Sequence, residues 1–178
     1  MDETRNYKYD VAISFAEEDR NAALALALAF ELKGLKQVFY YPQKQEEIIG
    51  ELLKEKLIKI YSQEAAYAII LFSESYLNNK PFPKLEFDAI RERMRQQTGV
   101  YLIPVKLSEM DLVNKLPELS ERQFLNWDFN PKKIVRLLSK RFNKKKVNSY
   151  KKSFTMNQAN NANGNGINKL ENKVSFKY

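Results

Sequence analysis

The segment YDVAISFAEEDRNAALALALAFELKG, residues 9–34, predicts a buried strand followed by a helix. YDVAISF is a short apolar run with β-branched residues, which suits a strand covered on both faces. Asp19 is placed to cap the helix, Ala and Leu dominate its body, and Gly34 is placed to end it. The chain therefore opens with a strand–helix unit.

The same alternation continues along the chain. Further strands are predicted over residues 36–41, 67–72, 100–107 and, more weakly, 122–128. The second helical pattern places four apolar residues on one face: Leu53, Leu57, Ile60 and Tyr61. Pro131 stands in the first turn of the last helix. Parallel strands need a helix to cover each crossover, so we expect a flavodoxin-like α/β fold with helices on both faces of the sheet.

Composition narrows the chemistry that the chain can carry out. The 178 residues are 44% apolar, which is enough for one globular domain, and they include no Cys and no His. Disulfides, thiol nucleophiles, Ser-His-Asp triads and Cys/His zinc sites are therefore excluded. The five Gly residues form neither a GxxxxGK[ST] loop nor a GxGxxG turn, which excludes P-loop nucleoside triphosphatases and Rossmann dehydrogenases. Any chemistry has to use carboxylates, hydroxyls, Lys or Arg.

Positive charge is concentrated at the C-terminal end. Residues 1–131 hold 17 Lys and Arg against 21 Asp and Glu, whereas residues 132–178 hold 13 against 1. This distribution indicates a basic arm on a mildly acidic body, so nucleic-acid binding, through residues 144–152, is only a minor alternative. No apolar run of membrane-spanning length and no secretory signal occur, so we expect a cytoplasmic protein without membrane contact.

The composition changes near residue 144, which divides the chain into a domain (1–143) and a tail (144–178). The tail is rich in Asn, Gly and Lys, and its last residues alternate, with Val174, Phe176 and Tyr178 as the apolar members. Two interpretations stay open. The tail is either a disordered linker, or an Asn-rich segment that lets copies of the chain stack on one another.

The carboxyl ends of the strands are where a doubly wound sheet binds ligands. Residues 15–20, 41–50 and 73–86 should therefore surround one crevice. Glu86 is expected in the first turn of the helix that follows the 67–72 strand, where the helix N-terminus would keep its carboxylate ionised. Its position fits either a helix-start charge or a catalytic group.

Several ordered motifs resemble the bacterial TIR (Toll/interleukin-1 receptor-like) domain. They are YDVAISFAEEDR, GLKQVFYY, IIGELLKEKLIKIY, YAIILFSESYLNN and the Glu in FPKLEFDAI, and together they span about residues 7–140. The resemblance implies a five-stranded parallel sheet and cleavage of NAD+ between nicotinamide and ribose, with ADP-ribose or a cyclic variant as the product. It makes Glu86 the catalytic residue, with Phe82 where the family commonly has Trp.

The implied reaction agrees with the composition. Nicotinamide leaves NAD+ as a neutral molecule, so no general acid is required, and one carboxylate can stabilise the oxocarbenium-like transition state. NAD+ is the substrate, and no cofactor or metal is expected.

The resemblance also implies substrate contacts. It assigns them to Phe15, Ala16, Arg20, Tyr41, Gly50, Leu52, Ser73, Tyr76 and Phe82. Simpler interpretations stay open for several of these. Arg20 can be the neighbour of a helix cap, Ser73 an ordinary turn residue, and Phe82 a core residue. Tyr41 stands where many relatives have Asp, so a polar contact to the substrate is missing.

Our leading hypothesis is an antiphage-defence effector or signal generator that is activated by self-association, because unregulated NAD+ cleavage would poison the cell and the tail composition would allow copies to stack. Its expected partners are NAD+, other TIR copies in an oligomer or filament, and an operon-encoded sensor or effector. The alternative is a non-catalytic adaptor that recruits other TIR copies through residues 41–50.

Overall fold

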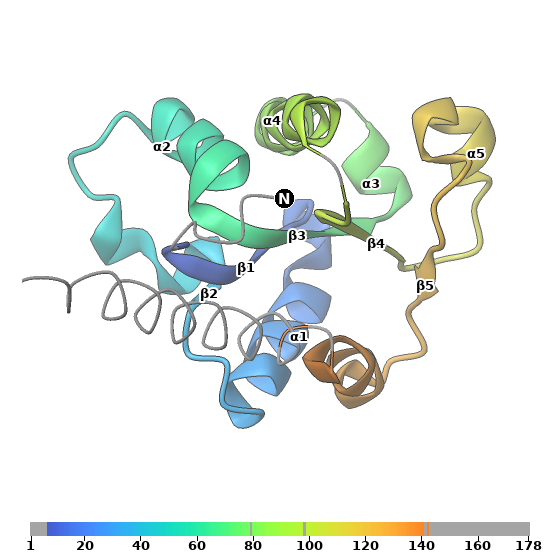
Figure 1. The fold of residues 1–178 in the computed structure, drawn as a ribbon, viewed down its shortest axis with the longest axis horizontal. Helices are drawn as coiled ribbons and strands as arrows, with labels where there is room; N and C mark the ends of the chain where they lie inside the picture. The colour runs from blue at the N-terminus through green and yellow to red at the C-terminus, as the bar shows by residue number, and fades with distance from the viewer. Residues whose placement is uncertain (1–6, 79, 98, 141, 143–178) are drawn as a thin grey trace, which may run out of the picture. The chain divides into compact units, whose positions relative to one another are not determined.

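The computed structural model describes residues 7–78, 80–97, 99–140 and 142 (Figure 1). Five strands form one sheet: β1 (Tyr9–Ser14), β2 (Val38–Phe39), β3 (Ala65–Phe72), β4 (Leu102–Lys106) and β5 (Leu125–Asn126). Their order is β2-β1-β3-β4-β5, and every neighbouring pair is parallel. The expected five-stranded α/β fold is confirmed. The predicted tail, residues 144–178, and the boundary at 143 lie outside the described residues.

Helices cover both faces of the sheet (Figure 1). They include α1 (Arg20–Leu32), α2 (Leu53–Lys59), α3 (Glu74–Leu77), α4 (Pro81–Gln96) and α5 (Leu112–Lys115). Residues 131–140 are also helical and begin at Pro131, as predicted. The helix α1 and the 131–140 helix lie on one face, and α2 and α4 lie on the other (Figure 1). No helix in the described residues is long and apolar enough to cross a bilayer.

The two edge strands are shorter than predicted. The 36–41 strand is reduced to Val38–Phe39, because Tyr41 and Pro42 begin a 3₁₀ turn. The 122–128 strand is reduced to Leu125–Asn126. An edge strand pairs on one side only, so fewer hydrogen bonds hold its ends in the extended conformation. By contrast the central strand β3 is buried along nearly its whole length.

The predicted apolar face of the second helix is confirmed. Leu57, Ile60 and Tyr61 are buried, and Leu53 packs against the same core. The α-helix itself ends at Lys59, and a π-helical turn, Ile60–Glu64, continues it to the start of β3. Such turns are rare and are often found at functional sites. Here the turn places the Tyr61 side chain against strand β1.

The buried side chain of Arg93, on α4, forms a hydrogen bond with the backbone of β3. Its side chain is 4% exposed, and Nη1 donates a 2.7 Å hydrogen bond to the carbonyl oxygen of Ala65. The guanidinium also lies 3.8 Å from the ring centroid of Tyr101, and Nε donates to Gln97. These contacts satisfy a buried carbonyl and place a cation over an aromatic face.

Replacing Arg93 by Met is expected to lower the free energy of unfolding by about 2–4 kcal/mol, because the Ala65 carbonyl loses its donor and Tyr101 loses the cation. Chemical denaturation measures this change. Arg95→Met is the matched control, since Arg95 is 69% exposed and its replacement should change stability by no more than about 0.5 kcal/mol. Equal effects of the two substitutions would contradict a structural role for Arg93.

Candidate active site

Glu86 lies in the protein interior, near the point in the sheet where the order of the strands reverses. The strand order runs from β1 outward to β2 and then back past β1 to β3, so the switch point lies between β1 and β3. Ser14 is the last residue of β1, and Ser73 directly follows β3. Ser14 Oγ is 2.5 Å from Glu86 Oε2, which places the carboxyl group at this point.

The expected position of Glu86 in the first turn of its helix is wrong. The helix α4 begins at Pro81, so Glu86 is its sixth residue and lies in the second turn. The helix N-terminus, where Pro81 and Pro83 have no backbone N–H group, therefore does not surround its carboxyl. Glu86 is only 7% exposed, and tertiary packing sets its environment.

The ionisation state expected for Glu86 is also wrong. Burial raises the pKa of its carboxyl to about 8, although hydrogen bonds from Ser14 and Tyr61 act in the opposite direction. A carboxylate that loses its hydration becomes harder to ionise. In the ligand-free protein at neutral pH, Glu86 is mostly the neutral acid.

A chain of hydroxyl groups leads from Glu86 to the backbone of its own helix. Ser14 Oγ donates a 2.5 Å hydrogen bond to Glu86 Oε2 and lies 2.8 Å from the hydroxyl of Tyr76. The Tyr76 hydroxyl donates at 3.3 Å to the carbonyl of Pro83. The hydrogen bond from Ser14 stabilises the ionised carboxylate, so it opposes the effect of burial on the pKa of Glu86.

Tyr61 closes the other side of the site. Its hydroxyl donates at 2.9 Å to the carbonyl of Ile13 and also contacts the Glu86 carboxyl. The backbone carbonyl of Tyr61 accepts a hydrogen bond from Tyr101, which fixes the π-helical turn in place. Burial raises the pKa of both Tyr61 and Tyr76 well above the usual range, so both hydroxyls stay protonated. They can donate to a carboxylate but do not act as bases.

Two contacts join the segment after β1 to the segment after β3. Ser73 Oγ donates a 2.5 Å hydrogen bond to Asp19, and Lys80 forms an ion pair with Glu18. Asp19 occupies the N-cap position of α1, but its side chain makes no cap hydrogen bond, so its expected capping role is wrong. Ser73 caps α3 by accepting from the backbone N–H of Tyr76. Ser73 therefore has both the turn role and a place at the crevice.

An aromatic pair lies at the carboxyl ends of β1 and β2. The rings of Phe15 and Tyr40 stack with centroids 5.4 Å apart, and Ala16 beside them is fully buried. Arg20 is close enough to interact electrostatically with Tyr40, although its ion pair is with Glu17 at 2.7 Å. Tyr40 is 2% exposed and Phe15 is half-buried, so the accessible part of this pair belongs to Phe15, with the cation of Arg20 nearby.

Phe82 is not a core residue. It is 44% exposed, whereas Glu86 one helical turn later is buried. The interpretation of Phe82 as a plug of the core is therefore wrong. Its ring stands at the surface near the start of α4, where a ligand could meet it.

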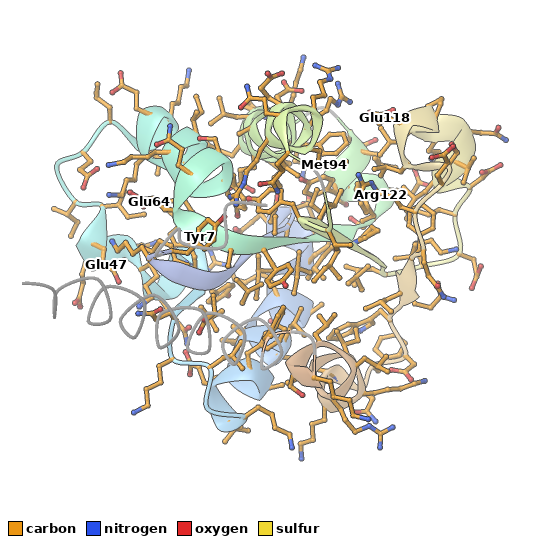
Figure 2. The ribbon with its side chains drawn as sticks, in the orientation of Figure 1. Tyr7, Glu47, Glu64, Met94, Glu118 and Arg122 are labelled. Carbon is orange, nitrogen blue, oxygen red and sulfur yellow. The ribbon has the colours of Figure 1, made fainter. Side chains whose placement is uncertain are left out.

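Glu47, in the loop after β2, binds residues at the start of β1, the opposite end of that strand from Ser14 and Glu86. Glu47 accepts from the Tyr9 hydroxyl at 2.8 Å and pairs with Lys8 at 2.7 Å. These partners hold the pKa of Glu47 down to about 2. Figure 2 shows Glu47 in this loop.

The loop residues predicted to touch the substrate differ in exposure. Tyr41 is half-buried and packs on the core, whereas Gly50 is exposed with φ +82° and Leu52 is 69% exposed. The left-handed φ explains the Gly at position 50. In this conformation the structure does not bring Gly50 or Leu52 together with Glu86.

Two residues of the Glu86 cluster were not predicted as site residues. Ser14 is a polar residue at the end of an otherwise apolar buried strand, and a buried hydroxyl requires a partner. That signal is readable from the sequence. Tyr61 was expected only to face the core, because nothing local indicates that its hydroxyl reaches β1. In the described residues, no group of three or more acidic side chains is arranged to hold a metal ion.

The family model described as TIR domain matches residues 11–146 of the chain. The chain belongs to the TIR domain family. The TIR domain of the Toll-related receptor TRR-2 from Hydra magnipapillata has the same fold, with a TM-score of 0.57 and 18% identity over 76% of this chain and 98% of that one.

A curated relative of this TIR domain is the 3' cyclic ADP-D-ribose synthase AaTIR from Aquimarina amphilecti. The two are 33% identical over 108 residues, which make up 61% of this chain and 32% of that protein. The match thus spans about a third of the length of the relative.

Proposed function

We propose that this TIR domain cleaves the bond between nicotinamide and ribose in NAD+, with Glu86 as the catalytic carboxylate. The observation that carries the proposal is a buried carboxyl at the β1/β3 switch point, in contact with hydroxyl groups and, within the part of the chain that the structure describes, with no second carboxylate. The 33% identity to a protein named as a 3' cyclic ADP-D-ribose synthase supports the same reaction class.

The reaction needs only one acidic group. The C–N bond breaks with its electron pair moving to the ring nitrogen, so the cationic nicotinamide leaves as a neutral molecule and needs no proton. The ribose carbon becomes positively charged, and an ionised Glu86 stabilises that charge. Water then attacks to give ADP-ribose, or a hydroxyl of the same molecule attacks to give a cyclic product, and in both cases the attacking oxygen releases a proton to solvent.

Substrate binding would prepare Glu86 for this role. The pyridinium ring carries a positive charge, and an opposite charge nearby favours the ionised carboxyl. NAD+ would thus help to remove the proton that the ligand-free site retains. Since Glu86 is only 7% exposed, the packing around it has to open for the ribose to reach it.

Side chains near Glu86 and at the carboxyl ends of the strands are proposed to make the remaining contacts with NAD+. The half-buried ring of Phe15, backed by Tyr40, offers a stacking surface, Arg20 a cation for the diphosphate, and Phe82 an exposed ring near the start of α4. Tyr76 acts through Ser14 and does not need to touch NAD+. Five further substrate contacts are proposed on the family resemblance alone: Ala16, Tyr41, Gly50, Leu52 and Ser73.

The activity is tested with the purified full chain at high concentration. Incubation with NAD+ should release nicotinamide, and mass spectrometry of the mixture should identify ADP-ribose or a cyclic isomer as the product. Absence of turnover under conditions in which the protein clusters would contradict the proposal.

A non-catalytic adaptor is the second candidate, and the loop after β2 favours it. Ile49 is 80% exposed and Leu52 is 69% exposed, which leaves two apolar side chains on the surface for another protein copy. An adaptor would bind other TIR domains and release no nicotinamide from NAD+.

We also propose that the enzyme serves as an antiphage-defence effector or signal generator, together with an operon-encoded partner, and that self-association switches it on. Uncontrolled NAD+ consumption would poison the host cell, so such an activity needs a switch.

Removing residues 144–178 is expected to abolish concentration-dependent activation, because the Asn-rich tail would no longer bring the domains together. Light scattering measures assembly, and nicotinamide release measures turnover, both across a range of protein concentration. The control replaces the tail by a Gly/Ser linker of the same length. It shows whether the presence of any segment at this position, rather than the Asn-rich sequence, is what matters. Unchanged assembly and unchanged activity after deletion would show that the tail has no such role.

A further inference from the structure

A basic hollow lies on the far side of α4 from the Glu86 cluster. It measures about 440 Å³ and is lined by Arg91, Met94, Arg95, Glu118 and Arg122. Figure 2 shows Met94 on α4 facing Glu118 and Arg122, which come from the segment after α5. Along α4, Arg91 and Arg95 are rotated by about 140° and 180° from Glu86, so the hollow is separate from the proposed active site.

One cation of the hollow is fixed in position. Arg91 Nη2 lies 2.6 Å from Glu118 Oε1, and its guanidinium lies 4.7 Å from the ring centroid of Phe87. The carboxylate therefore neutralises one of the three arginines and also holds the wall of the hollow together. A pre-positioned guanidinium loses little freedom when it binds a ligand.

The other two cations are more accessible. Arg95 has an exposed 3.4 Å pair with Glu92, and Arg91 also lies 3.8 Å from Asp88. Arg122 has no carboxylate within 4.0 Å in the part of the chain that the structure describes. The lining of the hollow itself has three arginines and one glutamate. A guanidinium without a carboxylate partner favours an anionic ligand.

The size and lining of the hollow indicate the kind of anion. A volume of about 440 Å³ is in the range of small-molecule sites. Guanidinium groups bind phosphate through paired hydrogen bonds, and Met94 offers a polarisable apolar surface for a flat ring. Acidic residues adjoin the basic ones, namely Asp88, Glu92 and Glu121, so a long nucleic-acid strand would meet repulsion beyond the hollow.

We propose that this hollow binds a nucleoside diphosphate, with the diphosphate on Arg95 and Arg122 and the base against Met94. The site is independent of the NAD+ reaction proposed above. ADP could also enter the Glu86 crevice, so the test needs a signal from the hollow itself.

The methionine methyl groups provide that signal. The chain has four methionines, and Met94 is the one in the hollow. In full-length protein labelled with ¹³C-methyl methionine, the Met94 resonance is assigned with Met94→Leu and followed during titration with ADP at low ionic strength. We expect saturable shifts with a Kd of about 1 mM or tighter.

The double variant Arg95→Gln/Arg122→Gln should weaken this binding at least about tenfold. Lys54→Gln/Lys132→Gln removes the same charge from two exposed lysines elsewhere and should leave the binding unchanged. A Met94 resonance that does not saturate, or equal weakening in both double variants, overturns the proposal. Pyrophosphate that binds as tightly as ADP overturns the role of the base. A single-stranded oligonucleotide that shifts Met94 at lower concentration than ADP overturns the assignment to a small molecule.

Discussion

Replacing Glu86 by Gln is expected to reduce NAD+ turnover at least about a hundredfold while the fold stays intact. Gln has the shape of the protonated acid and can keep the contact with Ser14, but it can never carry the negative charge that faces the ribose cation. Nicotinamide release by purified protein measures the loss. Circular dichroism and thermal unfolding check that the variant is folded.

The matched control for this experiment is Asp88→Asn. Asp88 lies two residues later on α4 and is 55% exposed, so the substitution removes the same charge outside the site. Its turnover should equal that of the unmodified chain. Turnover that survives in Glu86→Gln, or that is lost equally in both variants, would exclude Glu86 as the catalytic carboxylate.

The pH dependence gives an independent check of the same role. If the ionised form of Glu86 is the active one, kcat/KM should rise about tenfold per pH unit at low pH and level off above about pH 8, the pKa that burial produces in the free protein. The profile of kcat should bend at a lower pH, because bound NAD+ favours the ionised carboxyl. A flat kcat/KM profile between pH 6 and 9 would contradict a neutral Glu86 in the free enzyme.

Glu86→Gln is also expected to stabilise the fold at alkaline pH, by about 2–4 kcal/mol. The folded pKa of about 8 lies above the ordinary value of 4.5. Between these two values the unfolded chain releases the proton while the folded chain keeps it, so the unmodified protein loses stability as pH rises through this window. Gln does not titrate, so the free energy of unfolding of the variant does not fall over this pH range for this reason.

Denaturant unfolding at a series of pH values measures this difference. The stability gap between Glu86→Gln and the unmodified chain should be small below about pH 4, grow up to about pH 8 and then stay constant. Asp88→Asn removes an exposed carboxyl from the same helix and is the control for the change of charge. A gap of the opposite sign, with the variant less stable at pH 8, would mean that the folded protein holds Glu86 as a stabilised anion.

Much of the fold was predictable from the order of the apolar runs. The segment at residues 9–15 gave β1 almost to the residue, and the run at 67–72 gave the central strand β3. The edge strands were predicted too long, because their length depends on how many hydrogen bonds the neighbour offers. Local composition does not contain that information.

The candidate site was predictable in part. Glu86 was singled out, and Ser73 and Tyr76 do lie near the switch point. The start of α4 was misplaced by several residues, because Lys80 is extended and Pro81 takes the first helical position. Because of that error, we expected Glu86 in the first helical turn and therefore expected its carboxyl to be ionised.

The residue types in the sequence determined what this protein can do chemically. Without His or Cys, a single carboxylate is the natural catalytic group, and the strand–helix alternation places it beyond a parallel sheet. Only the tertiary structure decided that Glu86 is buried, neutral and bound to a hydroxyl 72 residues away in the chain. Sequence patterns report neighbours a few residues apart, whereas burial and pKa depend on side chains that meet only when the sheet and its helices have packed together.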